Sequence, residues 1–206
     1  MLKRILRNNF LLISLLIISG CATQIRPNIG LINTKKNIVE RSFFSGRFSV
    51  RYFNEVNEVR NVYGNFDFTN IANNINVILR SPLGIALATV AIDEKNASLK
   101  LSGKPVMLAD DVNWLMIKAL GFALPVEGLK YWLHGIASPK SNAVNQIYNH
   151  IGQLIKMEQD NWLIIFDYKD TRLSKIELNW ITHDELEKPL VIKLILNRAI
   201  HYKNSS

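Results

Sequence analysis

The stretch SGRFSVRYF, residues 45–53, decides the fold class because its apolar and polar side chains alternate one by one. Phe48, Val50 and Tyr52 fall on one side of this alternation, and arginine and serine fall on the other. A period of two predicts a strand with one face buried and one face in water. NVYGNFDFT, residues 61–69, repeats the pattern. The two stretches therefore predict half-buried antiparallel strands.

Further short apolar runs extend the strand pattern along the chain. They lie at residues 76–81, 85–93, 96–103, 104–108, 145–150, 152–158, 161–168, 173–180 and 190–197. Glycine, asparagine and aspartate mark several of the boundaries between them. About eleven antiparallel strands are too many for a flat sheet. We therefore expect a mainly β fold, a half-open antiparallel β-barrel.

A helical insertion interrupts the strands. In DDVNWLMIKALG, residues 110–121, either aspartate can cap a helix start, and in LPVEGLKYWLHG, residues 124–135, Pro125 suits a helix start. Gly121 and Gly135 suit the two helix ends. The predicted apolar faces comprise Val112, Leu115, Met116, Ala119 and Leu120 in the first helix, and Val126, Leu129, Trp132 and Leu133 in the second. We expect this pair of helices to form a plug or lid over the barrel interior.

The first residues have the organisation of a secretory signal peptide. In residues 1–20, three basic side chains precede an apolar run that ends at Ile18, and small residues follow before Cys21. The run is shorter than the roughly 20 apolar residues that a membrane-spanning helix needs. Ile18-Ser19-Gly20-Cys21 resembles the bacterial lipobox, in which the cysteine thiol receives a diacylglycerol. Cys21 is the only cysteine and has no disulfide partner in the chain, so we predict a lipid anchor there.

The rest of the chain is long enough for one domain. Residues 21–36 are polar and suit a tether after the lipidated cysteine, and residues 37–206 form the predicted barrel domain, with a short helix expected at 37–44. Lys and Arg exceed Asp and Glu by 25 to 17, for a net charge of +8. The basic residues do not cluster with aromatic ones, so nucleic acid is not an expected partner. We expect a monomer.

No motif in the sequence makes a positive case for an enzyme. His134, His150, His183 and His201 lack metal-ligand spacing, and nucleophile-elbow, phosphate-loop and zinc-protease motifs are absent. We therefore expect no metal and no cofactor. A lipid hydrolase would need a hydroxyl nucleophile beside one of these histidines. The available loop hydroxyls are those of Ser102, Ser138 and Ser141, and no sequence feature pairs them with a base.

The turn SPLG, residues 81–84, places an apolar side chain where water is the expected neighbour. Pro82 and Gly84 are turn residues, so Leu83 falls at the tip. Leu83 either folds back onto the core or meets an apolar partner outside the chain. Other apolar side chains either fill the barrel interior or line a cavity for an apolar ligand. The cavity and lid candidates are Phe48, Val50, Phe66, Phe68, Val77, Leu79, Leu87, Leu115, Met116, Trp132 and Leu133.

Five features in this order resemble the LolB family of outer-membrane lipoprotein receptors. They are the lipobox ending in Cys21, the opening SGRFSVRY, the SPLG turn, the ADD helix start at 109–111 and LPVEGLKYWLHG at 124–135. The likeness covers most of the chain after the signal peptide. It is weakest in the tether, at residues 70–76 and at residues 183–188.

The resemblance implies a hydrophobic cavity that receives the acyl chains of other lipoproteins. It implies that the protein takes this cargo from the periplasmic carrier LolA and places it in the inner leaflet of the outer membrane, without nucleotide or metal. The family's protruding leucine matches Leu83, so Pro82, Leu83 and Gly84 form the expected membrane-insertion loop. Its W-L-x-G segment matches Trp132, Leu133 and Gly135. The competing hypothesis is a structural lipoprotein of an envelope assembly complex that carries no lipid.

Overall fold

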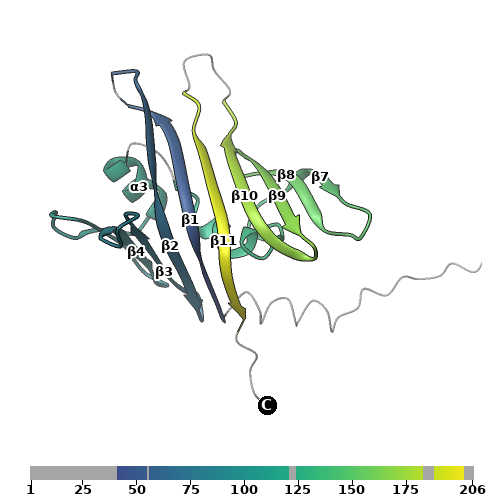
Figure 1. The fold of residues 1–206 in the computed structure, drawn as a ribbon. Coiled ribbons are helices and arrows are strands. Elements are labelled where there is room, and N and C mark those ends of the chain that lie inside the picture. Colours follow the sequence, from purple (N-terminus) through teal and green to yellow (C-terminus); the bar gives the residue numbers. More distant parts are fainter. Residues whose placement is uncertain (1–40, 55, 121–123, 183–187, 202–206) are drawn as a thin grey trace, which may run out of the picture. The chain divides into compact units, whose positions relative to one another are not determined.

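One antiparallel sheet of eleven strands is the main element of the fold (Figure 1). The computed structural model describes residues 41–54, 56–120, 124–182 and 188–201, which belong to one of the two units of the chain, residues 33–206. The predicted signal peptide, Cys21 and the tether lie outside the described residues. The strands are β1 (Arg41–Phe53), β2 (Val59–Ile71), β3 (Asn74–Arg80), β4 (Ala86–Ile92), β5 (Ala97–Leu101), β6 (Met107–Ala109), β7 (Val144–Tyr148), β8 (Leu154–Gln159), β9 (Trp162–Lys169), β10 (Arg172–Trp180) and β11 (Val191–His201).

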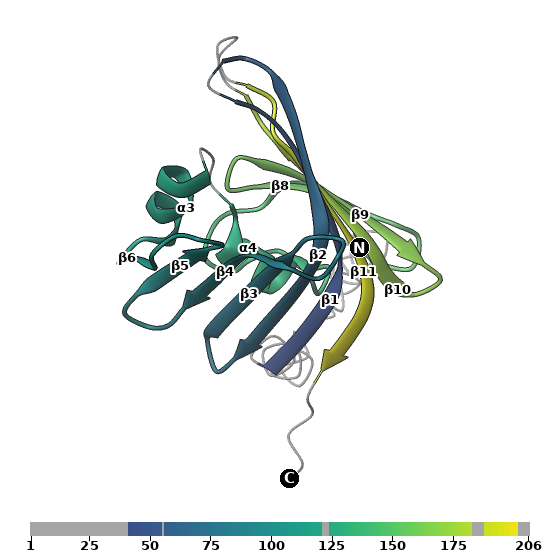
Figure 2. The same cartoon turned by 60° about the vertical axis from the view of Figure 1, so that its left-hand side comes forward.

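The sheet curves but does not close. Its strand order is β6-β5-β4-β3-β2-β1-β11-β10-β9-β8-β7, so among the described strands β6 and β7 are the two edges. The helices α3 (Val112–Leu120) and α4 (Val126–Trp132) are inserted between these edge strands. Figures 1 and 2 show the sheet curving around α4, with β3 to β5 on one side and β8 to β10 on the other. The predicted half-open barrel with a helical insertion is confirmed.

The alternation in β1 and β2 separates a buried face from a solvated one. Phe48 and Val50 of β1 and Phe66 and Phe68 of β2 are buried, whereas Arg47, which precedes Phe48, is exposed. Burying a phenylalanine side chain stabilises a fold by about 1.5–3 kcal/mol. A register shift of one residue would send every one of these rings into water, which is why the pattern specifies the pairing.

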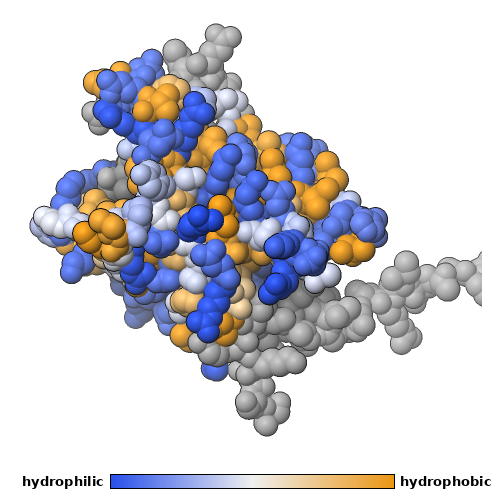
Figure 3. All heavy atoms as spheres, in the orientation of Figure 1, coloured by the Kyte–Doolittle hydropathy of each residue, from blue (hydrophilic) through white to orange (hydrophobic). Residues whose placement is uncertain are grey.

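On the outer face of β9, β10 and β11, basic and acidic side chains pair across neighbouring strands. Lys175 pairs across strands with Asp167 at 2.6 Å, and Lys193 pairs with Glu177 at 3.2 Å. The hydrogen bond to Asp167 raises the pKa of Lys175 above its ordinary value, with the charges of Asp167 and Glu177 adding to the effect. Figure 3 shows hydrophilic residues interspersed with smaller hydrophobic areas on this side of the sheet. This face is therefore suited to water.

Two glycines let neighbouring strands approach closely beside the buried rings. A Cβ atom on Gly46 would lie 1.9 Å from the carbonyl oxygen of Ile195, and one on Gly64 would lie 1.9 Å from that of Arg80. The rings of Phe66 and Phe48 also lie close to these two positions. Only glycine allows the backbones to approach this closely.

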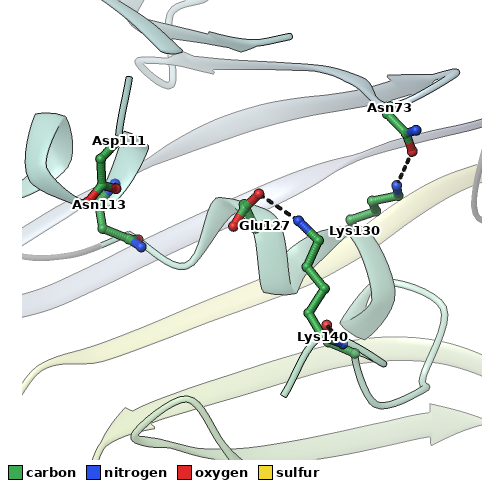
Figure 4. Close-up of polar contacts among 7 residues, drawn as sticks. Asn73, Asp111, Asn113, Glu127, Lys130 and Lys140 are labelled. Carbon is green, nitrogen blue, oxygen red and sulfur yellow. Dashed lines mark hydrogen bonds and ion pairs between the residues drawn. The ribbon is translucent and has the colours of Figure 1, made fainter. Parts of the chain in front are cut away.

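Helix α3 begins at the predicted cap. The Oδ1 atom of Asp111 accepts a hydrogen bond from the backbone N–H of Asn113 at 2.7 Å (Figure 4). Val112, Leu115 and Met116 are buried on its predicted apolar face. Neither described helix is long and apolar enough to cross a membrane.

Removal of this cap is expected to lower stability modestly. Asp111→Ala should reduce the free energy of unfolding by about 1 kcal/mol, because a helix N–H loses its side-chain partner. Urea unfolding followed by circular dichroism measures the change. Asp110→Ala is the matched control, since the Asp110 side chain forms no hydrogen bond with a described residue. Equal losses in the two variants would contradict a capping role for Asp111.

The prediction of a short helix at residues 37–44 is wrong over residues 41–44. This stretch is the start of β1, where Phe44 pairs with Phe68 of β2 on one side and with Ala199 of β11 on the other. The physical reason is that hydrogen bonding to strands on both sides outweighs a weak local helix preference. Residues 37–40 lie outside the described residues.

Candidate functional site

An apolar cavity lies between the concave face of the sheet and the α4 segment. Its lining residues are Phe48, Val50, Phe66, Phe68, Val77 and Leu79 from β1 to β3, Leu178, Ile192 and Leu194 from β10 and β11, and Leu124, Pro125, Leu129 and Leu133 from the α4 segment. All of these side chains are apolar. The cavity volume is only about 30 Å³, whereas pockets for drug-sized ligands measure roughly 300–1,000 Å³. The structure therefore represents a closed form.

Seven of the eleven residues predicted for a cavity or lid line this space. They are Phe48, Val50, Phe66, Phe68, Val77, Leu79 and Leu133. The other four, Leu87, Leu115, Met116 and Trp132, do not line it. Leu115, Met116 and Trp132 are buried elsewhere in the core, and Leu87 is half-buried.

The sequence-based prediction missed the contributions of three segments to the lining. Leu178 of β10 and Ile192 and Leu194 of β11 occupy inward positions of strands that had been predicted. The alternation in LSKIELNW could have identified Leu178, whereas LVIKLILN is apolar at nearly every position and does not show which side chains point inward. Leu124, Pro125 and Leu129 were predicted as part of the helical insertion, but no sequence pattern shows which of its residues reach the sheet.

Trp132 anchors the end of α4 through a buried amide. Its indole Nε1 donates to Oε1 of Gln159 on β8 at 2.9 Å, and the backbone N–H of Ser138 donates to the same oxygen at 2.9 Å. Nε2 of Gln159 donates to the carbonyl oxygens of Ser138 and Ser141 at 2.8 and 2.9 Å. Gln159 is 2% exposed, so every hydrogen-bonding group of its amide is used out of water. We did not predict Gln159, because a polar residue before an Asp-Asn turn normally points to solvent.

Two further side-chain contacts hold α4. Nζ of Lys130 lies 2.5 Å from Oδ1 of Asn73 in the β2–β3 turn, and Nζ of Lys140 lies 2.8 Å from Oε1 of Glu127 (Figure 4). The Glu127–Lys140 pair is solvent-exposed, and exposed ion pairs contribute about 1 kcal/mol or less. The two ends of α4 are therefore held unequally. Gly135 follows the helix with a left-handed φ of +69° and ends it as predicted.

The turn at residues 81–84 forms as predicted and points Leu83 outward. The N–H of Gly84 donates to the carbonyl of Ser81 at 2.9 Å, and Gly84 has a φ of +89°. Leu83 is 89% exposed, and the following Ile85 is 62% exposed. The alternative that Leu83 folds back onto the core is therefore excluded in this structure.

Of the polar candidates, His134 has a packing role, whereas His183 and the side chain of His201 lie outside the described residues. The ring of His134 packs edge-on against the ring of Phe44, and the two ring centroids are 4.9 Å apart. Among the described residues, the hydroxyls of Ser102, Ser138 and Ser141 form no hydrogen bond with a histidine. Tyr168 donates to the carbonyl of Leu154 at 3.0 Å, and burial raises the pKa of its phenol, which keeps the donor protonated. No group of three or more His, Cys, Asp or Glu in the described ranges could hold a metal ion.

Comparison with known proteins matches this arrangement to one family. The family model described as outer membrane lipoprotein LolB matches residues 42–198. The outer-membrane lipoprotein LolB of Cupriavidus taiwanensis is 37% identical over 161 residues, covering 75% of this chain and 78% of that protein. The proteins of the same name from Cupriavidus necator and Francisella tularensis subsp. novicida are 32% and 29% identical over 155 and 195 residues. They cover 75% and 89% of this chain, and 78% and 92% of their own lengths.

Among solved structures, a DUF1329 family protein from Desulfovibrio piger superposes with a TM-score of 0.45 at 6% identity. It covers 86% of this chain and 92% of that chain. A likeness at this level carries no argument about function. The family model and the relatives together decide the assignment: this chain belongs to the LolB family of outer-membrane lipoproteins.

Proposed function

We propose that this chain accepts lipoproteins from the periplasmic carrier LolA and inserts them into the inner leaflet of the outer membrane. The observation that carries the proposal is the cavity under α4, whose lining is apolar throughout. The protein would be anchored on the periplasmic face through Cys21, with residues 1–20 removed, residues 21–36 as the tether and residues 37–206 as a monomeric receptor domain. It would need no nucleotide and no cofactor.

The energetics of the cargo explain why an enclosed site is needed. A triacylated lipoprotein carries on the order of forty CH₂ groups, each worth about 0.8 kcal/mol when it is buried. Releasing them into water would cost tens of kcal/mol. Acyl chains must therefore pass from one apolar cavity to another. No nucleotide is required if each acceptor binds them better than the previous one.

The closed cavity requires α4 to move before an acyl chain can enter. Leu124, Pro125, Leu129 and Leu133 fill the space over the sheet. The buried bonds of Gln159 hold the Trp132 end of α4, whereas Glu127, near the other end, is held by an exposed ion pair with Lys140. We therefore infer that α4 swings outward about its Trp132 end.

Loosening the Lys130–Asn73 contact should speed acyl-chain uptake. Asn73→Gly removes one acceptor of the Lys130 ammonium, while glycine still suits the left-handed φ of +70° at this position. Loss of about 1 kcal/mol from the closed form should raise the uptake rate of a fluorescent fatty acid about fivefold. Ala72→Gly is the control, since it changes the same turn at φ +50° and leaves the Lys130 contact in place. Equal rates in both variants and the wild type would show that this contact does not hold α4 closed.

A transfer assay tests the proposed function directly. The mature chain with Cys21→Ala is mixed with LolA loaded with a radiolabelled lipoprotein, and the two proteins are then separated. Movement of label to this chain without nucleotide is the expected result. Retention of all label on the carrier, with this chain folded, would favour the competing role of a structural lipoprotein in an envelope assembly complex.

A further inference from the structure

A second and larger groove adjoins the cavity under α4, since Leu133 lines both. It is formed where the start of β1, the end of β11 and the β9–β10 turn lie at one end of the sheet (Figure 1). Its volume is about 670 Å³, which falls within the roughly 300–1,000 Å³ of pockets that bind small ligands. Of the two spaces, only the groove is open enough for a ligand in the closed form.

The floor of the groove is apolar. Phe44 and Leu133 lie at its base and are each 1% exposed. Ile136, Leu173 and Leu196 are half-buried around them. The half-buried Ile136, Leu173 and Leu196 keep apolar surface in contact with water, and a hydrocarbon segment that covered them would remove it.

The rim of the groove is cationic. Lys169, Arg172 and Arg198 contribute to its lining, and no described lining residue is an aspartate or glutamate. None of the three cations forms an ion pair with a carboxylate of the described residues. Lys175 of β10 and Lys193 of β11, by contrast, each have an acidic partner. The groove therefore combines an apolar base with uncompensated positive charge.

Two strand irregularities occur at this groove. The pairing of β1 with β11 skips Asn197, and the pairing of β9 with β10 skips Ser174. Both residues are part of the groove lining. Bulges redirect side chains and are frequent beside functional sites. They also add neutral polar groups to the groove lining.

We propose that this groove binds one anionic phospholipid of the membrane leaflet, with its phosphate against Lys169, Arg172 and Arg198 and the upper part of an acyl chain against Ile136, Leu173 and Leu196. The diacylglyceryl group of a lipoprotein contains no phosphate, so cargo binding does not account for the charge. The anchor proposed at Cys21 would hold the chain beside such a leaflet, and this choice of lipid source rests on the proposed function. Binding itself needs neither carrier nor cargo.

Equilibrium binding of short-chain lipids tests the proposal. The mature chain with Cys21→Ala is titrated with monomeric dihexanoyl phosphatidylglycerol, with dihexanoyl phosphatidylcholine and with inorganic phosphate, and binding of each probe is followed by ³¹P NMR. Phosphatidylglycerol is expected to bind and the other two to bind at least about tenfold more weakly, because only the first combines net negative charge with hydrocarbon. The double variant Arg172→Gln/Arg198→Gln should bind phosphatidylglycerol at least about tenfold more weakly.

The matched control is Arg51→Gln, which removes an exposed charge near the other end of β1 and should leave binding unchanged. If phosphatidylcholine binds as well as phosphatidylglycerol, the cations do not contribute to binding. If inorganic phosphate binds as well as phosphatidylglycerol, the apolar floor does not contribute. Unchanged binding in the double variant would place the lipid elsewhere. Each of these results, or no binding of phosphatidylglycerol, overturns the proposal, and none depends on whether the chain accepts cargo from LolA.

Discussion

Leu83→Glu is expected to abolish delivery of cargo into membranes while leaving the fold and cargo uptake intact. Leu83 is 89% exposed at the tip of the 81–84 turn, so its side chain makes little contribution to the core. In a bilayer, a leucine side chain gains about 1.5–3 kcal/mol from burial, whereas a charged glutamate strongly disfavours entry. A loss of about 3 kcal/mol corresponds to a fall in insertion of about a hundredfold.

The measurement is transfer of a radiolabelled lipoprotein from the loaded chain into liposomes, scored separately from uptake from LolA. Leu83→Met should retain insertion, because methionine is apolar and similar in volume. Ile151→Glu is the matched control, since Ile151 is 54% exposed in the turn between β7 and β8. If Leu83→Glu inserts cargo as well as Ile151→Glu, the 81–84 turn is not the insertion loop.

Gln159→Ala should cause the largest loss of stability among these variants. The side chain satisfies the indole N–H of Trp132, the N–H and carbonyl of Ser138 and the carbonyl of Ser141. Each buried polar group left without a partner costs about 1–3 kcal/mol. Because some of these groups can find water, we expect a loss of about 4 kcal/mol in the free energy of unfolding.

Urea unfolding monitored by tryptophan fluorescence measures this loss. Gln146→Ala is the control: Gln146 is an exposed glutamine on the edge strand β7, and its hydrogen bonds to Ala143 and Tyr148 are exposed. Its loss should be within about 1 kcal/mol. Similar unfolding midpoints for the two variants would mean that the Gln159 amide does not anchor α4. If Gln159→Ala folds normally but takes up acyl chains faster, the hinge of α4 does not lie at its Trp132 end.

Much of the fold could be predicted from local patterns. The alternation in residues 45–53 and 61–69 predicted β1 and β2 because a period of two can bury one face only as a strand. The helical spacing in residues 110–121 and 124–135 predicted α3 and α4 for the corresponding reason. Residues 41–44 were predicted wrongly, since so short a segment takes its conformation from the strands beside it.

The candidate site was less accessible to prediction. The exposed Leu83 followed from Pro82 and Gly84, because these residues restrict the chain to a turn whatever surrounds it. Its role in the membrane stays a prediction. Trp132 was placed correctly on a buried face but not with its partner, since Gln159 is 27 residues away in the sequence. No local pattern reports a hydrogen bond over that separation.

The sequence by itself determined the strands, the helical insertion and the exposed turn, because each depends on residues that are neighbours in the chain. The lipid anchor at Cys21 stays a prediction. The tertiary structure alone decided that the cavity is closed, that Gln159 holds one end of α4, and that Lys169, Arg172 and Arg198 line one groove. These features depend on distances between β1, α4, β8, β10 and β11. Such distances are set by how the whole sheet curves and packs, which no single segment specifies.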